Sequence, residues 1–269
     1  MAVAVVRRGG IVGRIIAVAN QKGGVGKTTT SVNLSASLAM ADHSVLLADV
    51  DPQANATSGL GLDPLRVGRT VYDCLTRGVT AKEVIQASSV PRLSVLPSCA
   101  DLAGAEVELV TVPGRETVLK SVLREIQDHY DYLILDCPPA LGLLTINALV
   151  AASSVLVPVQ CEYYAMEGLG RLLANIRRVQ ESFNPALELE GILLTMYDSR
   201  NTLSRQVAEE IRGHFKATVF ETSIPRNVTL AEAPSYGRPV MLYNAASAGS
   251  QAYIDLAKEF LDHGEKSAR

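Results

Sequence analysis

The sequence lacks several features that mark particular protein classes. Its four cysteines are Cys74, Cys99, Cys137 and Cys161, and none of them forms the C-x-x-C spacing of a zinc ribbon or a redox pair. No run approaches the ~18 consecutive apolar residues of a membrane-spanning helix. The short apolar run at the N-terminus precedes its arginines, the reverse of a signal peptide. We therefore expect a soluble, cytoplasmic protein with reduced thiols.

A strong charge of either sign is also missing. The formal net charge is −3 over 269 residues, from 25 Lys and Arg against 28 Asp and Glu. A total this close to zero gives no overall attraction to nucleic acid, although a basic patch can still form after folding or dimerisation. Hydrophobic residues make up 48% of the chain, which is enough for a sizeable core. Composition therefore predicts a globular protein and leaves its partners open.

Short, unalternating apolar runs recur along the chain, with segments of helical spacing between them. Such runs are typical of strands buried on both faces, and segments such as 27–41 and 116–130 have the spacing of helices. The alternation predicts an α/β fold, in which a mostly parallel, twisted sheet is flanked by helices on both faces. The predicted strands are 14–19, 44–50, 93–97, 131–136, 154–159 and 191–197.

No repeat or linker divides the chain. Folds of the α/β class commonly reach ~250 residues as a single unit, so we expect one domain over residues 14–262. Residues 1–13 are expected to form a flexible arm and residues 263–269 a loose tail.

The stretch NQKGGVGKTTT (20–30) joins the first predicted strand to the first predicted helix. Its glycines allow backbone N–H groups to turn inward, and the helix N-terminus adds a positive dipole end, so the loop predicts a cradle for phosphates. Lys27 can reach the β and γ phosphates, and the Thr28 hydroxyl can bind Mg²⁺. The predicted nucleotide-binding residues of this loop are Lys22, Gly23, Gly24, Val25, Gly26, Lys27, Thr28 and Thr29.

This loop departs from the pattern G-x-x-x-x-G-K-[ST]. Gln21 stands where the first glycine belongs, and a second lysine, Lys22, follows it. A simple nucleotide cradle has no evident need for that second cation.

Acidic residues end two of the predicted strands. Asp49 and Asp51 lie at the carboxyl end of the second strand, at the sheet edge where ligands of open α/β sheets bind. Asp51 is the better candidate for contact with metal or water, whereas Asp49 is equally well explained as a capping or turn residue. Asp136 ends the apolar strand YLILD, which is the form of a Walker B strand whose acid holds Mg²⁺. The predicted metal site comprises Thr28, Asp51 and Asp136.

Six stretches together resemble the ParA/Soj chromosome-partitioning ATPases, in the deviant-Walker group of P-loop ATPases that also contains MinD. They are NQKGGVGKTTT, DVDPQANATSGLG, DCPPALGLLTINAL, PVQCEYYAMEGL, LLTMYDSR and IPRNVTLAEAPS. The resemblance extends from about residue 14 to residue 262, and the combination is far more specific than any single motif. It implies Mg²⁺-dependent hydrolysis of ATP to ADP and phosphate.

The resemblance also implies roles for individual residues. Lys22 matches the signature lysine of the group, which crosses a dimer interface to the phosphates of the partner's ATP. A cation supplied in trans would stabilise charge that grows in the transition state. Asp51 matches the acid that orients or activates the attacking water, and Asp136 matches the Walker B acid. The catalytic residues implied are Lys22, Lys27 and Asp51.

An adenine pocket is implied near two further stretches, TMYD (195–198) and IPRN (224–227). Pro225 offers apolar contact and Asn227 offers hydrogen bonds, with Met196 and Arg226 beside them. Both stretches could equally be turns that follow strands, so this pocket is a looser inference.

Members of this family bind double-stranded DNA without sequence preference as ATP-bound homodimers, and a ParB/Spo0J-like protein stimulates hydrolysis. Arg200 falls where the family places a DNA-contacting arginine, and Arg205 and Arg226 could join it. Thr229 stands where close relatives commonly carry a second such arginine, which weakens the expectation of tight binding there. The resemblance therefore implies a cytoplasmic, nucleoid-associated protein with no membrane partner.

Three other functions stay open at this stage. A related ATPase could position protein cargo on the nucleoid. A MinD-like membrane ATPase would need a basic, amphipathic C-terminal helix, whereas QAYIDLAKEFLDHGEKSAR has the apolar stripe of a docked helix with acids among its lysines. An electron-transfer ATPase like nitrogenase iron protein would need two cysteines per subunit for its cluster, and neither Cys99 nor Cys137 has the expected surroundings.

Overall fold

The computed structural model describes residues 13–267, and the side chains of the last helix as far as His263. The expected arm over 1–13 therefore lies, apart from Gly13, outside the described residues. The last helix continues to Ser267, past the boundary at 262 where we expected the domain to end.

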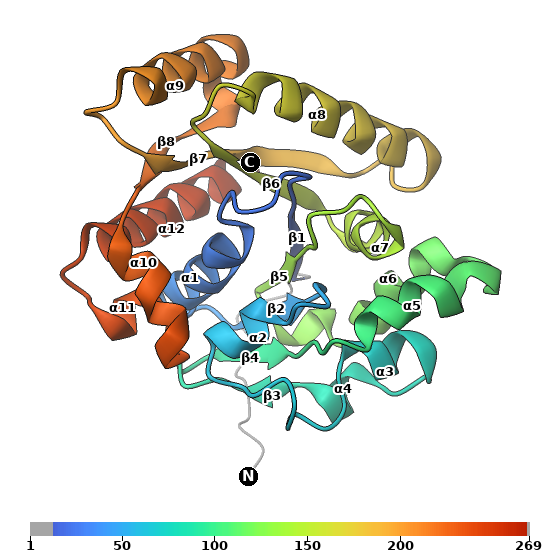
Figure 1. The fold of residues 1–269 in the computed structure, drawn as a ribbon. Coiled ribbons are helices and arrows are strands. Elements are labelled where there is room, and N and C mark those ends of the chain that lie inside the picture. The colour runs from blue at the N-terminus through green and yellow to red at the C-terminus, as the bar shows by residue number, and fades with distance from the viewer. Residues whose placement is uncertain (1–12, 268–269) are drawn as a thin grey trace.

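An eight-stranded sheet forms the centre of the molecule (Figure 1). Its order is β3-β4-β2-β5-β1-β6-β7-β8, and every neighbouring pair is parallel except β3 and β4. The sheet confirms the predicted mostly parallel α/β fold. The strands are β1 (Arg14–Val18), β2 (Val45–Asp49), β3 (Gln86–Ala87), β4 (Leu93–Leu96), β5 (Tyr132–Asp136), β6 (Ser154–Gln160), β7 (Glu188–Tyr197) and β8 (Val219–Pro225).

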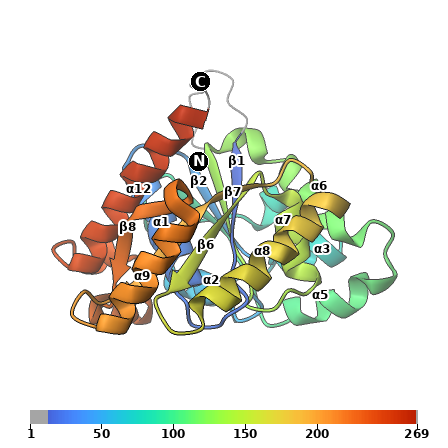
Figure 2. The ribbon, with the colours of Figure 1, turned by 90° about the horizontal axis from the view of Figure 1, so that it is seen from above.

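Helices cover both faces of this sheet (Figures 1 and 2). One face carries α1 (Lys27–Met40), α2 (Asn55–Gly59), α10 (Val228–Glu232), α11 (Val240–Tyr243) and α12 (Ala248–Ser267). The other carries α3 (Val71–Thr76), α4 (Ala81–Val84), α5 (Leu102–Glu108), α6 (Val118–Arg124), α7 (Leu143–Ala151), α8 (Ala165–Ser182) and α9 (Thr202–Phe215). Short 3₁₀ turns are η1 (Leu109–Thr111), η2 (Arg115–Thr117), η3 (Gln127–His129), η4 (Lys216–Thr218) and η5 (Ala233–Tyr236).

Each central strand contributes side chains to two apolar cores, one on each face of the sheet. Side chains of a strand alternate between its faces, so Ile15 and Ala17 of β1 join one apolar core while Ile16 and Val18 join the other. All four are buried. This burial on both faces explains why the strand reads as a continuous apolar run.

Three parts of the prediction differ from the structure. Strands β3 and β8 were missed: β3 has only two residues, and β8 lies at an edge where polar Glu221 interrupts its apolar pattern. The predicted helix over 116–130 is too long, because α6 covers only Val118–Arg124 and Ile126 leaves the helical region with φ −123°. The chain turns there to enter β5 beside β1.

The topology brings three strand ends together. Strands β2, β5 and β1 are neighbours in the sheet, and their carboxyl ends carry Asp49, Asp136 and the glycine-rich loop. This is the edge at which open α/β sheets bind ligands. None of the helices in the described part of the chain is long and apolar enough to cross a membrane.

A close backbone contact fastens α2 to the C-terminal part of the chain. Gly61 (φ +83°) and Gly237 (φ +61°) are both left-handed, and a Cβ on Gly237 would lie 2.6 Å from the Gly61 Cα. We expect Gly237→Ala to lower the free energy of unfolding by at least ~1–2 kcal/mol, because a left-handed backbone disfavours any side chain and the contact leaves no room for one. The midpoint of urea unfolding measures this loss.

Gly213→Ala is the matched control. Gly213 lies within α9, where an added Cβ meets no atom within 4 Å. This substitution should stabilise the protein by ~0.5–1 kcal/mol through the helix preference of alanine. Equal unfolding midpoints for the two variants would contradict the packing described here.

Candidate functional site

The loop between β1 and α1 has the backbone of an anion cradle. Gly24 (φ +73°) and Gly26 (φ +86°) take left-handed conformations, and Gly26 is the N-cap of α1 without a side-chain cap. A Cβ on Gly23 or Gly24 would meet nothing within 4 Å, so the surface of this loop is open. Thr195 at the end of β7 fixes the loop by donating a 2.8 Å hydrogen bond to the Val25 carbonyl. The cradle is therefore open to a ligand, and Thr195 holds its backbone in place.

Lys27 is held inside this cradle. It is 7% exposed, and its Nζ donates to the backbone oxygen of Lys22 over 3.3 Å. Burial lowers the pKa of Lys27, while the nearby Asp136 opposes that effect. A buried cation at the start of a helix is suited to bind phosphate oxygens.

Asp136 accepts hydrogen bonds from two hydroxyls of α1. Thr28 Oγ1 donates to Oδ2 and Ser31 Oγ donates to Oδ1, both over 2.8 Å. Burial raises the pKa of Asp136 to about 6, although both hydroxyls act in the opposite direction. The contact places a hydroxyl and a carboxylate side by side, which are the hard oxygen donors that Mg²⁺ prefers.

The donor set fits Mg²⁺ better than a metal that needs a full protein cage. Among residues 13–267 no group of three or more His, Cys, Asp or Glu side chains could hold a metal ion. Magnesium in nucleotide sites is typically held by one or two protein oxygens together with phosphate oxygens and water. Thr28 and Asp136 satisfy that requirement.

Asp49 and Asp51 lie beside Asp136. Asp49 is fully buried, and burial together with the charge of Asp136 raises the pKa of Asp49 to about 7. Its carboxylate accepts from Thr57 N and Oγ1 over 2.8 and 2.7 Å, so it serves as a buried acceptor within the fold. Asp51 is 6% exposed, and its Oδ1 accepts from Gln53 N over 2.9 Å. The structure thus brings the three predicted acids together.

Lys22 is directed away from the cradle of its own chain. Its backbone N–H donates to Asn20 Oδ1 over 3.0 Å, while its Nζ pairs with Glu162 Oε2 over 2.6 Å. Gln160 holds the other oxygen of Glu162 over 2.6 Å. The Lys22 side chain is 49% exposed. Two roughly half-exposed charges form this pair, and exposed pairs are typically worth less than ~1 kcal/mol, so the lysine can leave it easily.

The region predicted to bind adenine borders a cavity of about 440 Å³. Met196 takes a left-handed backbone (φ +50°), which is uncommon for a non-glycine residue and tends to occur at functional sites. Asn227 Oδ1 is buried and accepts no hydrogen bond within the described chain. An orphaned acceptor of this kind fits the amino group of a base. Residues that line the cavity include Glu162, Tyr163, Tyr164, Met196, Asp198 and Arg226.

The three predicted DNA-contacting arginines are all exposed. Arg200 follows β7, and its side chain, 89% exposed, forms a two-pronged pair of 3.0 Å hydrogen bonds with Asp198. This pairing raises the pKa of Arg200 and lowers that of Asp198. Arg205 lies in α9, whereas Arg226 lines the cavity, closer to the proposed base site.

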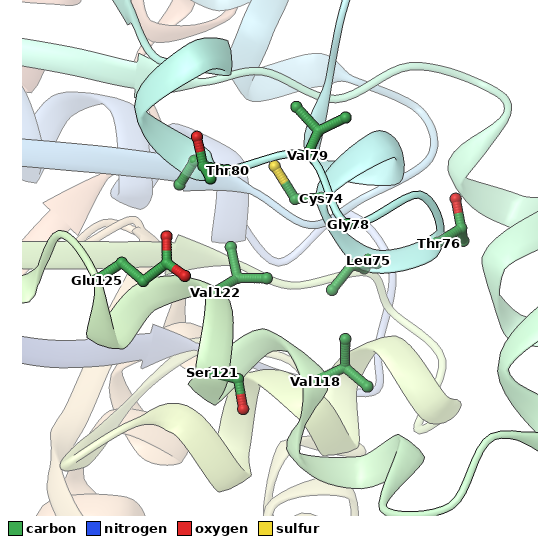
Figure 3. A pocket seen from close by; sticks show the side chains of 11 residues that line it. Cys74, Leu75, Thr76, Gly78, Val79, Thr80, Val118, Ser121, Val122 and Glu125 are labelled. Carbon is green, nitrogen blue, oxygen red and sulfur yellow. The ribbon is translucent and has the colours of Figure 1, made fainter.

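A second cavity, of about 290 Å³, lies apart from all the predicted site residues (Figure 3). It opens between the α3–α4 segment and α6, and Val79, Val122 and Glu125 are among its lining residues. Cys74 also lines it, and burial raises the pKa of this thiol to about 12. The thiol therefore stays protonated, and the cavity carries no chemistry comparable to that of the strand-end site.

Sequence reasoning missed several residues of the site. Ser31 lies one helical turn after Lys27, and this spacing could have identified it as a second hydroxyl facing Asp136. Two further residues could not have been identified from the sequence. Glu162 pairs with Lys22, and the Ser98 hydroxyl donates to the Asp51 carbonyl, so each makes contact with a residue far away in the sequence.

Comparisons with known proteins agree with this geometry. A family model described as "AAA domain" matches residues 13–189. Sporulation initiation inhibitor protein Soj of Bacillus subtilis is 54% identical over 252 residues, covering 94% of this chain and 100% of Soj. Chromosome partitioning protein ParA of Myxococcus xanthus is 52% identical over 250 residues, covering 93% and 88%.

One solved structure is similar to this chain over nearly the whole length of both proteins. It is a cobyrinic acid a,c-diamide synthase from Mycobacterium smegmatis with bound ATP analogue and magnesium. The two proteins are 40% identical with a TM-score of 0.84, and the match covers 96% of this chain and 98% of that one.

The buried acids make stability depend on pH. The raised pKa values of Asp49 and Asp136, about 7 and about 6, mean that the folded protein keeps protons that the unfolded chain, with carboxyl pKa values of ~4, has released. The free energy of unfolding should therefore fall as pH rises from about 4 to about 7. Urea unfolding in EDTA, without nucleotide, at several pH values measures this.

Asp49→Asn provides the comparison, because an amide stays neutral throughout. The variant should lose less stability than the original chain between pH 5 and pH 8. If the two lose stability equally, Asp49 does not contribute to the pH dependence.

Proposed function

This chain belongs to the Soj/ParA family of chromosome-partitioning ATPases, and on that basis we propose that it is an ATP-driven DNA-segregation protein. The carrying observation is the Thr28–Asp136 contact beside the glycine cradle and Lys27. The groups that would donate hydrogen bonds to phosphate and those that would bind Mg²⁺ lie at the same edge of the sheet, which supports this proposal. The activity is hydrolysis of ATP to ADP and phosphate, with Mg²⁺ as cofactor.

The residues of the cradle would divide the work between binding and chemistry. Backbone N–H groups of the loop and Lys27 bind the phosphates. Thr28 and Asp136 would hold Mg²⁺, which neutralises developing charge on the phosphate oxygens when it is bound. Asp51 would orient the attacking water, and its Oδ2 has no hydrogen-bond partner among the described residues. Met196, Pro225, Arg226 and Asn227 would enclose the adenine.

Lys22 would act on a second copy of the chain. Its Nζ lies on Glu162 rather than in its own cradle, and its side chain is half-exposed. In an ATP-bound homodimer, the lysine would exchange Glu162 for the more strongly charged phosphates of the partner's ATP. Hydrolysis would then require two subunits. The rate of hydrolysis in the dimer would therefore set how long the dimer stays bound to DNA.

The dimer would bind double-stranded DNA without sequence preference. Arg200 and Arg205, exposed near the start of α9, would contact phosphates, and Arg226 would contribute where nucleotide leaves it accessible. Hydrolysis, stimulated by a ParB/Spo0J-like partner, would release the dimer from DNA. The protein would accordingly associate with the nucleoid in the cytoplasm. A related role, positioning protein cargo on the nucleoid, would use the same ATPase residues.

Two observations argue against the other candidates. The side chains of Tyr253, Leu256 and Phe260 are buried, so the described part of α12 is docked on the core rather than available to a membrane as in a MinD-like protein. Cys137 is fully buried, which does not suit a cluster shared between two subunits.

Substitutions at Asp51 and Lys22 should separate hydrolysis from dimerisation. We expect Asp51→Ala to bind ATP and form a stable dimer but to hydrolyse ATP at least ~100-fold more slowly, the usual contribution of a positioned acid or base. Lys22→Ala should bind ATP as a monomer. Light scattering with ATP and single-turnover hydrolysis measure the two properties, and Lys120→Ala, an exposed lysine of α6, is the control. Normal hydrolysis by Asp51→Ala would show that Asp51 does not orient the attacking water.

Retention on DNA tests the proposed partner directly. The protein is incubated with non-specific duplex DNA or with anionic liposomes, each with ADP or with a slowly hydrolysed ATP analogue. We expect retention on DNA only with the ATP analogue, and a loss of affinity as salt rises. Retention on liposomes alone would instead support a MinD-like protein.

Arg200→Ala should weaken DNA binding and reduce the salt slope by ~1 for each DNA phosphate that Arg200 neutralises. Asp198→Asn should strengthen binding, because it releases Arg200 from its carboxylate partner. Arg66→Ala is a matched control: Arg66 is also exposed and paired with an aspartate, Asp63, but belongs to the opposite end of the sheet. Equal effects of Arg200→Ala and Arg66→Ala would contradict a DNA-binding role for Arg200.

A further inference from the structure

A closed ring of hydrogen bonds surrounds the backbone of Asp51. The Asp51 N–H donates to Asp49 Oδ1 over 3.2 Å, and the Asp51 carbonyl accepts from Ser98 Oγ over 2.8 Å. Thr57 Oγ1 donates to Asp49 Oδ2 over 2.7 Å and accepts from Ser98 N over 2.9 Å. Each bond leads to the next, and the fourth returns to Asp51.

The ring is buried and has a fixed direction. Asp49, Thr57 and Ser98 are all fully buried, so water does not compete for their polar atoms. The Asp51 carbonyl can only accept, so the Ser98 hydroxyl must donate to it, and the Ser98 N–H must donate to Thr57 Oγ1. When Asp49 is ionised, the Thr57 hydroxyl donates to Asp49. Buried polar networks in which every member is satisfied hold their atoms in a single arrangement.

The ring also joins two segments that are distant in sequence. Asp49 ends β2 and Asp51 follows it, whereas Ser98 follows the neighbouring strand β4. Thr57 lies in α2 and connects the two. The peptide group before the Asp51 Cα is therefore held by Asp49, two residues earlier, and the one after it by Ser98 from a distant segment together with the Ala54 N–H.

We propose that Ser98 and Thr57 are positioning residues for ATP hydrolysis, which hold the Asp51 backbone so that its carboxylate meets the attacking water. This inference rests on the proposed role of Asp51. Neither residue needs to touch ATP: each acts through Asp51. A carboxylate aligns a water only while its Cα is fixed, and small misplacements of such groups cost large factors in rate.

Because the ring is separate from the phosphate cradle, its loss should reduce kcat and leave the KM for ATP unchanged. Ser98→Ala removes only the bond to the Asp51 carbonyl. Thr57→Val removes the hydroxyl while keeping the volume, and Thr57→Ser restores it. We expect Ser98→Ala and Thr57→Val to lower kcat about tenfold, equivalent to ~1.4 kcal/mol of transition-state stabilisation, and Thr57→Ser to recover most of that loss.

Ser250→Ala is the matched control. Ser250 is a fully buried serine of α12 whose hydroxyl has no partner within the described chain, so its removal should leave kcat unchanged. Thermal unfolding of each variant shows whether a fall in kcat merely follows a loss of folded protein.

The decisive measurement combines Ser98→Ala with Asp51→Ala in steady-state hydrolysis of ATP by the full chain. If Ser98 acts through Asp51, it should have no further effect once the carboxylate is absent. Unchanged kcat in both Ser98→Ala and Thr57→Val would overturn the inference, as would a tenfold effect of Ser98→Ala that persists without Asp51. If Asp51→Ala itself hydrolyses ATP normally, the proposed function of Asp51 fails, which is a separate result.

Discussion

Three carboxylates placed at the ends of two neighbouring strands impose the main constraint on this structure. Asp49, Asp51 and Asp136 are buried or nearly so, and charge in such surroundings is costly unless hydrogen bonds or cations compensate for it. Hydroxyls of α1 and α2 supply part of that compensation, and Lys27 supplies a neighbouring positive charge. The loop, the first helix and the turn after β2 are therefore arranged around the acids. A bound metal would complete the same arrangement.

The parts of this centre can be predicted because each belongs to a short local motif, although the loop and Asp136 are far apart along the chain. The glycines, Lys27 and Thr28 share one loop, and burial on both faces gives β1 and β5 uninterrupted apolar runs. Contacts between distant segments were beyond prediction: the pairing of Lys22 with Glu162 joins residues 140 positions apart, and that of Ser98 with the Asp51 carbonyl spans 47. The edge strand β8 was missed for the same reason, since its assignment as a strand depends on its pairing with β7.

The two lysines of the loop differ in what the single chain can do with them. Lys27 is buried over its own cradle, and its Nζ donates to the Lys22 carbonyl. Lys22 already has a partner in Glu162, and both are accessible. The single chain therefore holds one lysine inside the cradle and the other in an exposed ion pair, a kind of pair that is typically weak. In the proposed homodimer, this difference would couple nucleotide binding to association.

The order of strands in the sheet also bears on how the protein is made. β1 is the first strand in the chain, yet its partners in the sheet are β5 and β6, with Arg14 opposite Tyr132 and Ile16 opposite Ser154. On the ribosome, the phosphate loop must wait without its sheet until more than half of the chain has emerged. Pairings this distant form slowly and leave apolar strands exposed in the meantime. We therefore expect the nascent N-terminal half to expose the apolar faces of its strands until β5 and β6 have emerged.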